Sequence, residues 1–354
     1  MSVAVQATLD RRYEKADRPT IYFIGVTTGK SSIMTVFPRW AEHLGLAGAE
    51  IRGIDCKRHD DPRVYRRVVE FLRSDPLSLG ALVTTHKIDL VAACRDLFDE
   101  LDPFARLMGE VSGISKRFSR GDKGAVPFSL RENWDSLQVV SRGVWRVRLV
   151  GHAKDPISSG QALEAFLPPD HWRRTRAEVL VLGAGGSSIA ITCYLMDPKH
   201  GQNRPSRILV TNRSTPRLRE IEAIHGQLGS PVLAEYYHTP TPEDNDALVG
   251  RLSPHSLVVN ATGLGKDAPG SPITSLARFP EQGYAWDFNY RGDLVFLDQA
   301  RAAQTKHRLH VEDGWIYFLH GWIRVISEVF DLRIPVRGPE FDTLAQIAAE
   351  VRLS

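Results

Sequence analysis

A glycine-rich turn between a strand pattern and a helix pattern is the first feature of this chain that predicts chemistry. The apolar, β-branched run at residues 179–182 is typical of a buried parallel strand. It stops at Gly183-Ala184-Gly185-Gly186, and an apolar stretch long enough for a helix follows. In a dinucleotide site the first glycine permits the tight turn, the next lets a pyrophosphate approach the backbone, and the helix start offers free N–H groups to the phosphates. The alternative is a packing turn in another kind of α/β protein.

The cofactor preference depends on the residues after the next strand. Residues 207–211 (RILVT) predict that strand, which leads into Asn212-Arg213-Ser214-Thr215-Pro216-Arg217. A site that prefers NAD usually has Asp or Glu here to hold the ribose 2′-hydroxyl. This segment has no acid, and Arg213 and Arg217 are spaced to bind an extra phosphate. We therefore expect NADP(H) rather than NAD(H), with NAD possible; the alternative is that both arginines only solvate a loop.

Composition and charge favour a globular enzyme over several other classes of protein. The chain has 354 residues, enough for two domains, with 42% hydrophobic and 25% charged residues. The net charge of +3 is small and the basic residues are interleaved with acids, so we expect no nucleic-acid partner. No apolar segment reaches membrane-spanning length, and the first residues lack a signal-peptide core. We expect a cytoplasmic protein without a membrane partner.

The three cysteines, Cys56, Cys94 and Cys193, are scattered along the chain. They have no metal-ligand spacing to histidines, and we expect reduced, packed thiols and no metal.

The N-terminal part predicts a second α/β unit. Strands are expected at residues 20–25, 49–54 and 79–83, and helices at 34–44 and 64–72. This alternation is typical of a parallel sheet. Because such sheets bind ligands at strand ends, Thr27–Ser32 and Thr84–Lys87 are candidate site segments.

Several of these segments, taken in order along most of the chain, resemble the shikimate and quinate dehydrogenases. The segment GALVTTHK is similar to the family motif that carries a catalytic lysine, which makes Lys87 the corresponding residue. His152-Ala153-Lys154-Asp155-Pro156 resembles the segment whose aspartate pairs with that lysine, which implies Asp155 as the partner. Ser31 and Ser32 lie on the loop that binds the substrate carboxylate in that family.

The resemblance extends to the cofactor domain and the C-terminal part. Asn260-Ala261-Thr262-Gly263-Leu264-Gly265 matches closely, Asp287-Phe288-Asn289-Tyr290 stands where an Asp-x-x-Tyr segment is expected, and Asp313-Gly314 opens a last long helix. The cofactor-binding residues implied are Gly183, Ala184, Gly185, Gly186, Ser187, Asn212, Arg213, Arg217, Ala261, Thr262 and Gly314. The substrate-binding residues implied are Ser31, Ser32, Thr84, Ser112, Lys154, Tyr290, Tyr317 and Gly321.

The substrate positions depart from the family pattern more than the cofactor positions do. The serine loop lacks the Ser-x-Ser-Pro spacing, and Ser112, Ala153 and Gly321 stand where the family has asparagine, asparagine and glutamine. A site that pairs specific hydroxyls discriminates by factors of about 10⁴ or more when those partners are missing. The resemblance therefore implies an enzyme that kept its hydride chemistry and changed its substrate.

The chemistry of an alcohol dehydrogenase requires a group that exchanges the hydroxyl proton. A lysine next to an aspartate suits this role, because the carboxylate orients the ammonium and partial burial lowers the pKa of the amine. Lys87 is the expected general acid/base and Asp155 its orienting partner. The alternatives are a solvated lysine at a strand end and an aspartate that caps the helix of residues 157–166.

Other candidate residues have two interpretations each. His86 assists Lys87, or is a packed or solvated histidine; Lys154 holds an anionic substrate, or faces water. For Thr28 and Lys30 we have one hypothesis, that they replace the lost carboxylate contacts. Tyr290 lines the nicotinamide side of the site, or is a core tyrosine.

The first residues of the last helix include several aromatics. Trp315, Tyr317, Phe318 and Trp322 have spacings of three and four that make most of them core. Tyr317 and Gly321 face the site if the resemblance holds.

Residues 115–150 form a longer segment than the family's usual hairpin. Alternation at residues 144–150 predicts a half-buried strand that leads to Asp155. The extra residues, including Trp134, either cover the active site or make a dimer contact.

Together these observations predict an α/β fold of two domains with a cleft between them. Residues 1–158 and 312–354 are expected to form a substrate domain with a mainly parallel sheet, and 159–311 a Rossmann NADP-binding domain. The expected function is an NADP-dependent alcohol/ketone oxidoreductase acting on a cyclic polyol or hydroxy acid, as a monomer or homodimer. The alternatives are a true shikimate or quinate dehydrogenase and a non-catalytic NADP(H)-binding regulatory protein.

Overall fold

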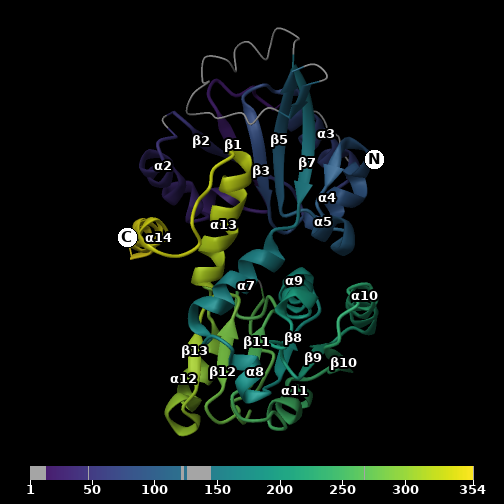
Figure 1. Cartoon of the computed structure of the whole chain (residues 1–354), viewed down its shortest axis with the longest axis vertical. Helices are drawn as coiled ribbons and strands as arrows, with labels where there is room; N and C mark the ends of the chain where they lie inside the picture. Colours follow the sequence, from purple (N-terminus) through teal and green to yellow (C-terminus); the bar gives the residue numbers. More distant parts are fainter. Residues whose placement is uncertain (1–12, 47, 121–122, 126–144, 267, 354) are drawn as a thin grey trace. The chain divides into compact units, whose positions relative to one another are not determined.

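The computed structural model describes residues 13–46, 48–120, 123–125, 145–266 and 268–353, in two compact units (Figure 1). The first unit comprises residues 1–154 and 321–354, and the second comprises residues 155–320. The boundaries differ from the expected 158/159 and 311/312. Helix α7 (Asp155–Phe166) packs along α9 (Gly186–Leu195) of the second unit, and α13 (Trp315–Val329) continues without a break through the second boundary.

The first unit contains a mixed seven-stranded sheet with the order β2-β1-β3-β5-β7-β4, and β6 pairs with β5. Strand β1 is parallel to β2 and β3, as the alternating pattern predicts, whereas β5 is antiparallel to both β3 and β7. The strands are β1 (Thr20–Gly25), β2 (Glu50–Asp55), β3 (Ser78–Val83), β4 (Glu100–Leu101), β5 (Gly113–Arg120), β6 (Lys123–Ala125) and β7 (Trp145–His152).

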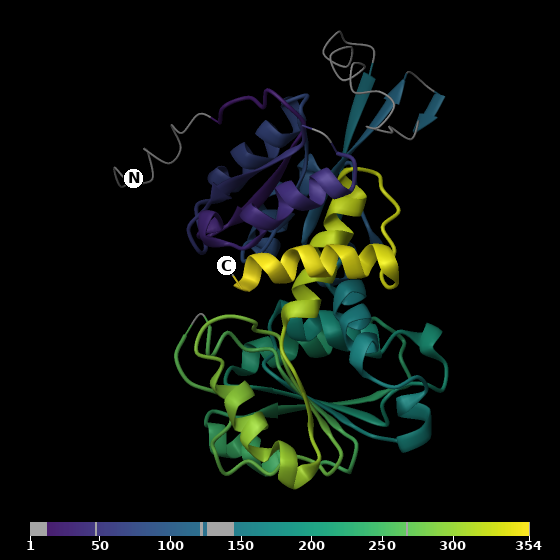
Figure 2. The same cartoon turned by 90° about the vertical axis from the view of Figure 1, so that its left-hand side faces the viewer.

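Helices cover both faces of this sheet, as Figures 1 and 2 show. Tyr22 of β1 contacts Phe71 of α3 with ring centroids 5.4 Å apart, and Phe23 contacts Trp322 of α13 at 5.1 Å. Because consecutive strand residues point to opposite faces, α3 and α13 lie on opposite sides of the sheet. Besides α13, the helices of this unit are η1 (Thr28–Lys30), α2 (Ile33–His43), α3 (Pro62–Ser74), α4 (Lys87–Cys94), η2 (Arg95–Leu97), α5 (Pro103–Met108) and α14 (Pro339–Leu353).

Helix α2 packs against α14 and against Phe330, the residue that follows α13. The buried rings of Phe37 and Phe330 are stacked with centroids 6.0 Å apart. The indole of Trp40 is fully buried, and its N–H donates to the carbonyl oxygen of Leu344 at 2.8 Å. The C-terminal helix is therefore part of the core of the first unit.

The second unit contains a six-stranded, fully parallel sheet with the order β10-β9-β8-β11-β12-β13. In chain order this is 3-2-1-4-5-6, the order of a doubly wound dinucleotide-binding sheet. The strands are β8 (Val179–Leu182), β9 (Arg207–Asn212), β10 (Leu233–His238), β11 (Leu257–Asn260), β12 (Tyr284–Asp287) and β13 (His310–Glu312).

Helices also cover both faces of the second sheet (Figure 2). Leu180 and Leu182 of β8 belong to a core cluster with Phe296 of α12 and Leu248 of α11. All four residues of β8 are buried, which explains their unbroken apolar run. Besides α7 and α9, the helices are α8 (His171–Thr175), η3 (Pro198–His200), α10 (Thr215–Gly226), α11 (Pro242–Val249) and α12 (Val295–His307).

The long segment between residues 115 and 150 is in part an antiparallel hairpin of β5 and β7, with Gly113 opposite His152. Leu149 is buried and Arg148 is exposed, as the alternation predicts. Trp134 and the proposal that the extra residues cover a site or form a dimer lie outside the described residues.

Within the described ranges, none of the helices combines the length and the hydropathy that crossing a membrane requires.

Candidate active site

The glycine turn after β8 has the backbone that the sequence predicts. Gly183 has a φ of +106°, and a Cβ added there would lie 3.1 Å from the carbonyl oxygen of Ala261. A side chain at this position would therefore be strained and crowded. Gly185 is the N-cap of α9, and a Cβ added to it would have no atom within 4 Å. The start of α9 thus combines free N–H groups with open space, which suits a pyrophosphate.

The end of β11 lies beside this turn because β11 pairs with β8. The Asn260 side-chain oxygen accepts from the Thr262 N–H at 3.1 Å and from its hydroxyl at 2.6 Å. These bonds hold the Ala261–Thr262 segment next to Gly183. Ala184 is buried, and Ser187 in the first turn of α9 is half-buried.

The predicted adenosine side of the site is the carboxyl end of β9. The Gly183 N–H donates to the Thr211 carbonyl at 2.9 Å, which joins this end of the strand to the glycine turn. The Asn212 side chain donates to the Ser214 carbonyl at 3.1 Å. Arg213 and Arg217 are both exposed, and the Arg217 guanidinium lies 2.6 Å from Glu220.

Around β12, a buried acid and a glycine position the start of α13. Asp287 is fully buried, and burial raises its pKa to about 6. Its Oδ1 accepts from the Asn289 N–H at 2.9 Å and from the Asn260 amide at 3.2 Å. A Cβ at Gly314 would lie 2.1 Å from the Phe288 carbonyl oxygen, so only glycine fits there.

The two candidate tyrosines lie in an aromatic cluster of the second unit. The Tyr290 ring is 4.8 Å from Phe318, and the Tyr317 ring is 4.9 Å from Phe288, measured between centroids. Both tyrosines remain half-buried. These contacts agree with the interpretation of Tyr290 as a core residue.

In the first unit, strand pairing brings the expected substrate segments to one edge of the sheet. The Thr84 N–H donates to the Ile24 carbonyl, and the Val83 N–H donates to the Ser112 carbonyl. The Ser112 N–H in turn donates to the His152 carbonyl at 2.8 Å. The ends of β1, β3 and β7 and the start of β5 therefore meet at this edge, which we call the ligand edge. It carries Ser31, Ser32, Thr84, Lys87, Ser112 and Lys154.

Lys87 is the first residue of α4 and is half-buried. Its carbonyl accepts from the Val111 N–H at 3.2 Å, which joins the lysine segment to the residue before Ser112. Asp155 is buried. It is the first residue of α7, whereas the alternative interpretation placed it at the N-cap, just before the helix. Each of the two candidate catalytic residues thus occupies the first turn of a helix, one in each unit.

His86 is fully buried, as expected for a packed histidine. Its Nδ1 lies 3.1 Å from the Tyr65 hydroxyl, and burial lowers the pKa of the imidazole. His86 is also the N-cap residue of α4, directly before Lys87.

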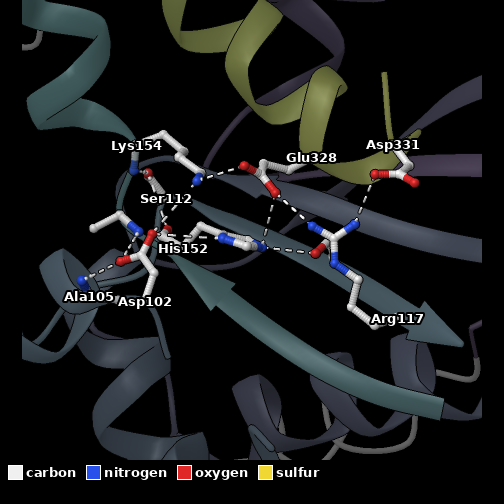
Figure 3. A network of polar contacts seen from close by, with 10 residues as sticks. Asp102, Ala105, Ser112, Arg117, His152, Lys154, Glu328 and Asp331 are labelled. Atoms are coloured by element: carbon white, nitrogen blue, oxygen red, sulfur yellow. Dashed lines mark hydrogen bonds and ion pairs between the residues drawn. The ribbon is translucent and has the colours of Figure 1, made fainter. Parts of the chain in front are cut away.

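Lys154 does not face water, so that alternative is wrong. Its side chain is only 13% exposed, and its ammonium lies 2.8 Å from Glu328 of α13 and 3.8 Å from Asp102 (Figure 3). Its backbone N–H donates to the Ser112 hydroxyl at 2.9 Å. Because two carboxylates balance the ammonium, Lys154 is a poor candidate for holding an anionic substrate.

The network around Lys154 contains residues that the sequence analysis did not single out (Figure 3). His152 Nε2 lies 2.8 Å from the Ser115 hydroxyl, and Glu328 also pairs with Arg117 at 2.8 Å. Burial alone raises the pKa of Glu328, but the nearby cations reverse this and hold it below its ordinary value. A sequence signal existed: Glu328 follows Gly321 by seven residues, two turns along one helix face.

Across the described residues, no group of three or more His, Cys, Asp or Glu side chains is placed to hold a metal ion. Cys56, Cys94 and Cys193 are all buried, as expected for packed thiols.

Gly321 is a glycine in the interior of α13, and a Cβ there would meet no atom within 4 Å. We expect Gly321→Ala to raise the free energy of unfolding by roughly 0.5–1 kcal/mol, because alanine has the higher helix propensity. Urea unfolding measures this change. Gly160→Ala is the matched control. It should lower the free energy of unfolding, because its Cβ would lie 2.1 Å from the Tyr194 ring. A loss of stability in Gly321→Ala would contradict the open space at this position.

No protein-family model matches the chain, and no curated protein is similar to it in sequence. Solved structures, in contrast, share its fold over almost the whole length. Shikimate 5-dehydrogenase from Thermus thermophilus, in complex with NADP(H) and shikimate, is 21% identical with a TM-score of 0.62, over 94% of this chain and 99% of that chain. Quinate dehydrogenase from Corynebacterium glutamicum, in complex with NAD, is 18% identical with a TM-score of 0.66, over 95% of this chain and 100% of that chain. The 5-ketofructose reductase of Gluconobacter is 16% identical with a TM-score of 0.60, over 94% of this chain and 99% of that chain. The resemblance seen in the sequence is thus confirmed for the fold.

Proposed function

We propose that this protein is an NADP(H)-dependent oxidoreductase that interconverts a hydroxyl and a ketone on a cyclic polyol or hydroxy acid. The observation that carries the proposal is the glycine turn after β8, with its positive φ at Gly183 and open space at Gly185. Proteins of the same fold are named as dehydrogenases of shikimate and quinate and as a reductase of 5-ketofructose. These names include acids and a neutral ketose, so both classes of substrate are candidates.

The residues around the glycine turn fit a dinucleotide. The N–H groups at the start of α9, with Ser187 in its first turn, would bind the pyrophosphate. Arg213 and Arg217 would bind a ribose 2′-phosphate, and Ala261, Thr262 and Gly314 would approach the remainder of the cofactor. When bound, the nicotinamide accepts or supplies the hydride.

The chain's own part in the reaction is proton transfer. In oxidation, the Lys87 amine takes the proton of the substrate hydroxyl while the carbinol hydrogen leaves as hydride; in reduction, the ammonium returns a proton to the ketone oxygen. Asp155 orients the ammonium and stabilises its charge.

The preference for NADP(H) is tested by the double variant Arg213→Ala/Arg217→Ala. Charge-assisted bonds to a phosphate contribute about 1.5–3 kcal/mol each, so we expect the NADP(H)-to-NAD(H) ratio of kcat/KM to fall at least about 10-fold. Steady-state kinetics with both cofactors measures the ratio. Arg219→Ala, an exposed arginine on the same helix, is the control. A wild-type enzyme that prefers NAD(H) would contradict the assignment.

A substrate panel followed by cofactor absorbance tests the function itself. It contains shikimate, quinate, aminoshikimate, inositols and other cyclitols. Turnover of aminoshikimate, an inositol or another cyclitol supports the proposal, and efficient turnover of shikimate or quinate instead supports the true family enzyme. NADP(H) binding without turnover of any member would support the regulatory alternative.

A further inference from the structure

At the ligand edge, one carboxylate oxygen of Asp55 accepts two hydrogen bonds. Strands β1 and β2 are parallel neighbours, and Asp55, the last residue of β2, is paired with Gly25 at the end of β1. Thr28 follows shortly after Gly25, and both its N–H and its hydroxyl donate to Oδ1 of Asp55, at 2.8 Å and 2.6 Å. The carboxylate is therefore fixed with its second oxygen, Oδ2, left for another partner.

Gly53 of β2 leaves the space that the Thr28 side chain occupies beside Asp55. Thr28 is 3% exposed, and a Cβ on Gly53 of β2 would lie 2.1 Å from the Thr28 hydroxyl oxygen. Any side chain at residue 53 would therefore displace the threonine from Asp55. Glycine at this strand position weakens the strand and is explained by such a close approach.

Asp55 lies at the surface of the first unit. The residue is exposed, and in the described part of the chain Oδ2 has no hydrogen bond or ion pair. A carboxylate oxygen of this kind accepts hydrogen bonds from hydroxyl groups and repels a second carboxylate.

Of the groups at this edge that could bind a substrate carboxylate, Thr28 and Lys154 are already used by the protein, and Ser31 and Ser32 offer only neutral hydroxyls. Both donors of Thr28 bind Asp55, and the Lys154 ammonium is balanced by Glu328 and Asp102. Lys30 is exposed to water, where a single ammonium attracts an anion only weakly.

We infer that the substrate is a neutral polyhydroxy compound and that Asp55 accepts a hydrogen bond from one of its hydroxyls. This inference rests on the proposed oxidoreductase function and narrows its substrate class. Asp55 then determines specificity in two ways, because it binds a hydroxyl and disfavours a hydroxy acid in the same place.

Asp55→Asn tests the inference, because the asparagine oxygen still accepts both bonds from Thr28 and the local fold is kept. The wild-type protein is expected to have a higher kcat/KM for inositols and other cyclitols than for shikimate or quinate. In the variant, kcat/KM for the neutral substrate should fall about 10- to 100-fold, as for loss of a charged hydrogen-bond partner. Inhibition by shikimate should strengthen, and the Kd for NADPH should not change. Glu70→Gln, which removes an exposed acid of α3, is the control.

Calorimetric binding of inositol and shikimate to the protein saturated with NADP⁺ separates this inference from the proposed function. Inositol binding that weakens in Asp55→Asn supports the inference even where no turnover occurs, and such a lack of turnover would count against the function alone. Preference of the wild type for the carboxylates, or an unchanged inositol affinity in the variant, overturns the inference and leaves the oxidoreductase function intact.

Discussion

Replacing Lys87 with alanine is expected to lower turnover at least about 100-fold, the usual size of a general acid/base contribution. Lys87 starts α4 at the ligand edge, and its side chain is half-buried, so the change should remove an amine without opening a core cavity. The Kd for NADPH should stay the same, because the glycine turn belongs to the other unit. Steady-state kinetics with the substrate that the panel identifies, together with NADPH fluorescence, measures both quantities.

Lys57→Ala is the matched control for Lys87→Ala, because Lys57 is an exposed lysine of the same unit. Its turnover should equal that of the wild type. A rate in Lys87→Ala that also equals the wild-type rate would remove the lysine from the mechanism.

Replacing Lys116 with methionine is expected to change how stability depends on pH. Lys116 is 4% exposed, and its ammonium donates to the Asp75 carbonyl at 2.5 Å. Burial lowers the pKa of this lysine from the ordinary 10.5 to about 7, although the charge of Asp75 opposes the change. Between pH 7 and 10.5 the unfolded chain therefore binds more protons than the folded protein, and the stability of the wild type rises with pH in this window.

The expected change in the free energy of unfolding follows from about 1.4 kcal/mol for each pH unit by which the pKa differs between the folded and unfolded states. The buried ammonium weakens the folded state by on the order of 5 kcal/mol below pH 7, and this penalty disappears as the pH approaches 10.5. Lys116→Met lacks the penalty, so its stability relative to the wild type should be highest at pH 6 and decline toward pH 10. Urea unfolding at several pH values measures the difference.

Lys57→Met again provides the control, because it removes an exposed ammonium and keeps the same change of side chain. A stability difference between Lys116→Met and the wild type that stays constant from pH 6 to pH 10 would show that the buried amine is not the cause.

Elements whose pattern depends only on local burial were predicted well. The strands at Thr20–Gly25 and Val179–Leu182 have the bounds expected from the sequence. Both are buried on both faces, so each is an unbroken run of residues suited to a strand. The tight turn expected at Gly183 is present, and its φ is positive.

The domain boundaries were less predictable, because they depend on which helix packs against which sheet. Residues 155–158 belong to the second unit because α7, which they begin, packs along α9. Gly160 of α7 lies against the ring of Tyr194 of α9, 34 positions later in the chain. The composition of this segment does not show that choice.

The amino-acid sequence by itself determined the two α/β units, the tight glycine turn after the strand at residues 179–182, and the placement of Lys87 at a strand end. These features follow from hydrophobic period and from the backbone limits of glycine, which act over a few residues. Only the tertiary structure decided that Lys154 pairs with Glu328, 174 positions later, and that Thr28 binds Asp55 across two strands. Charged and polar side chains choose partners by distance in space, and that distance is set only when the sheet and its helices have packed.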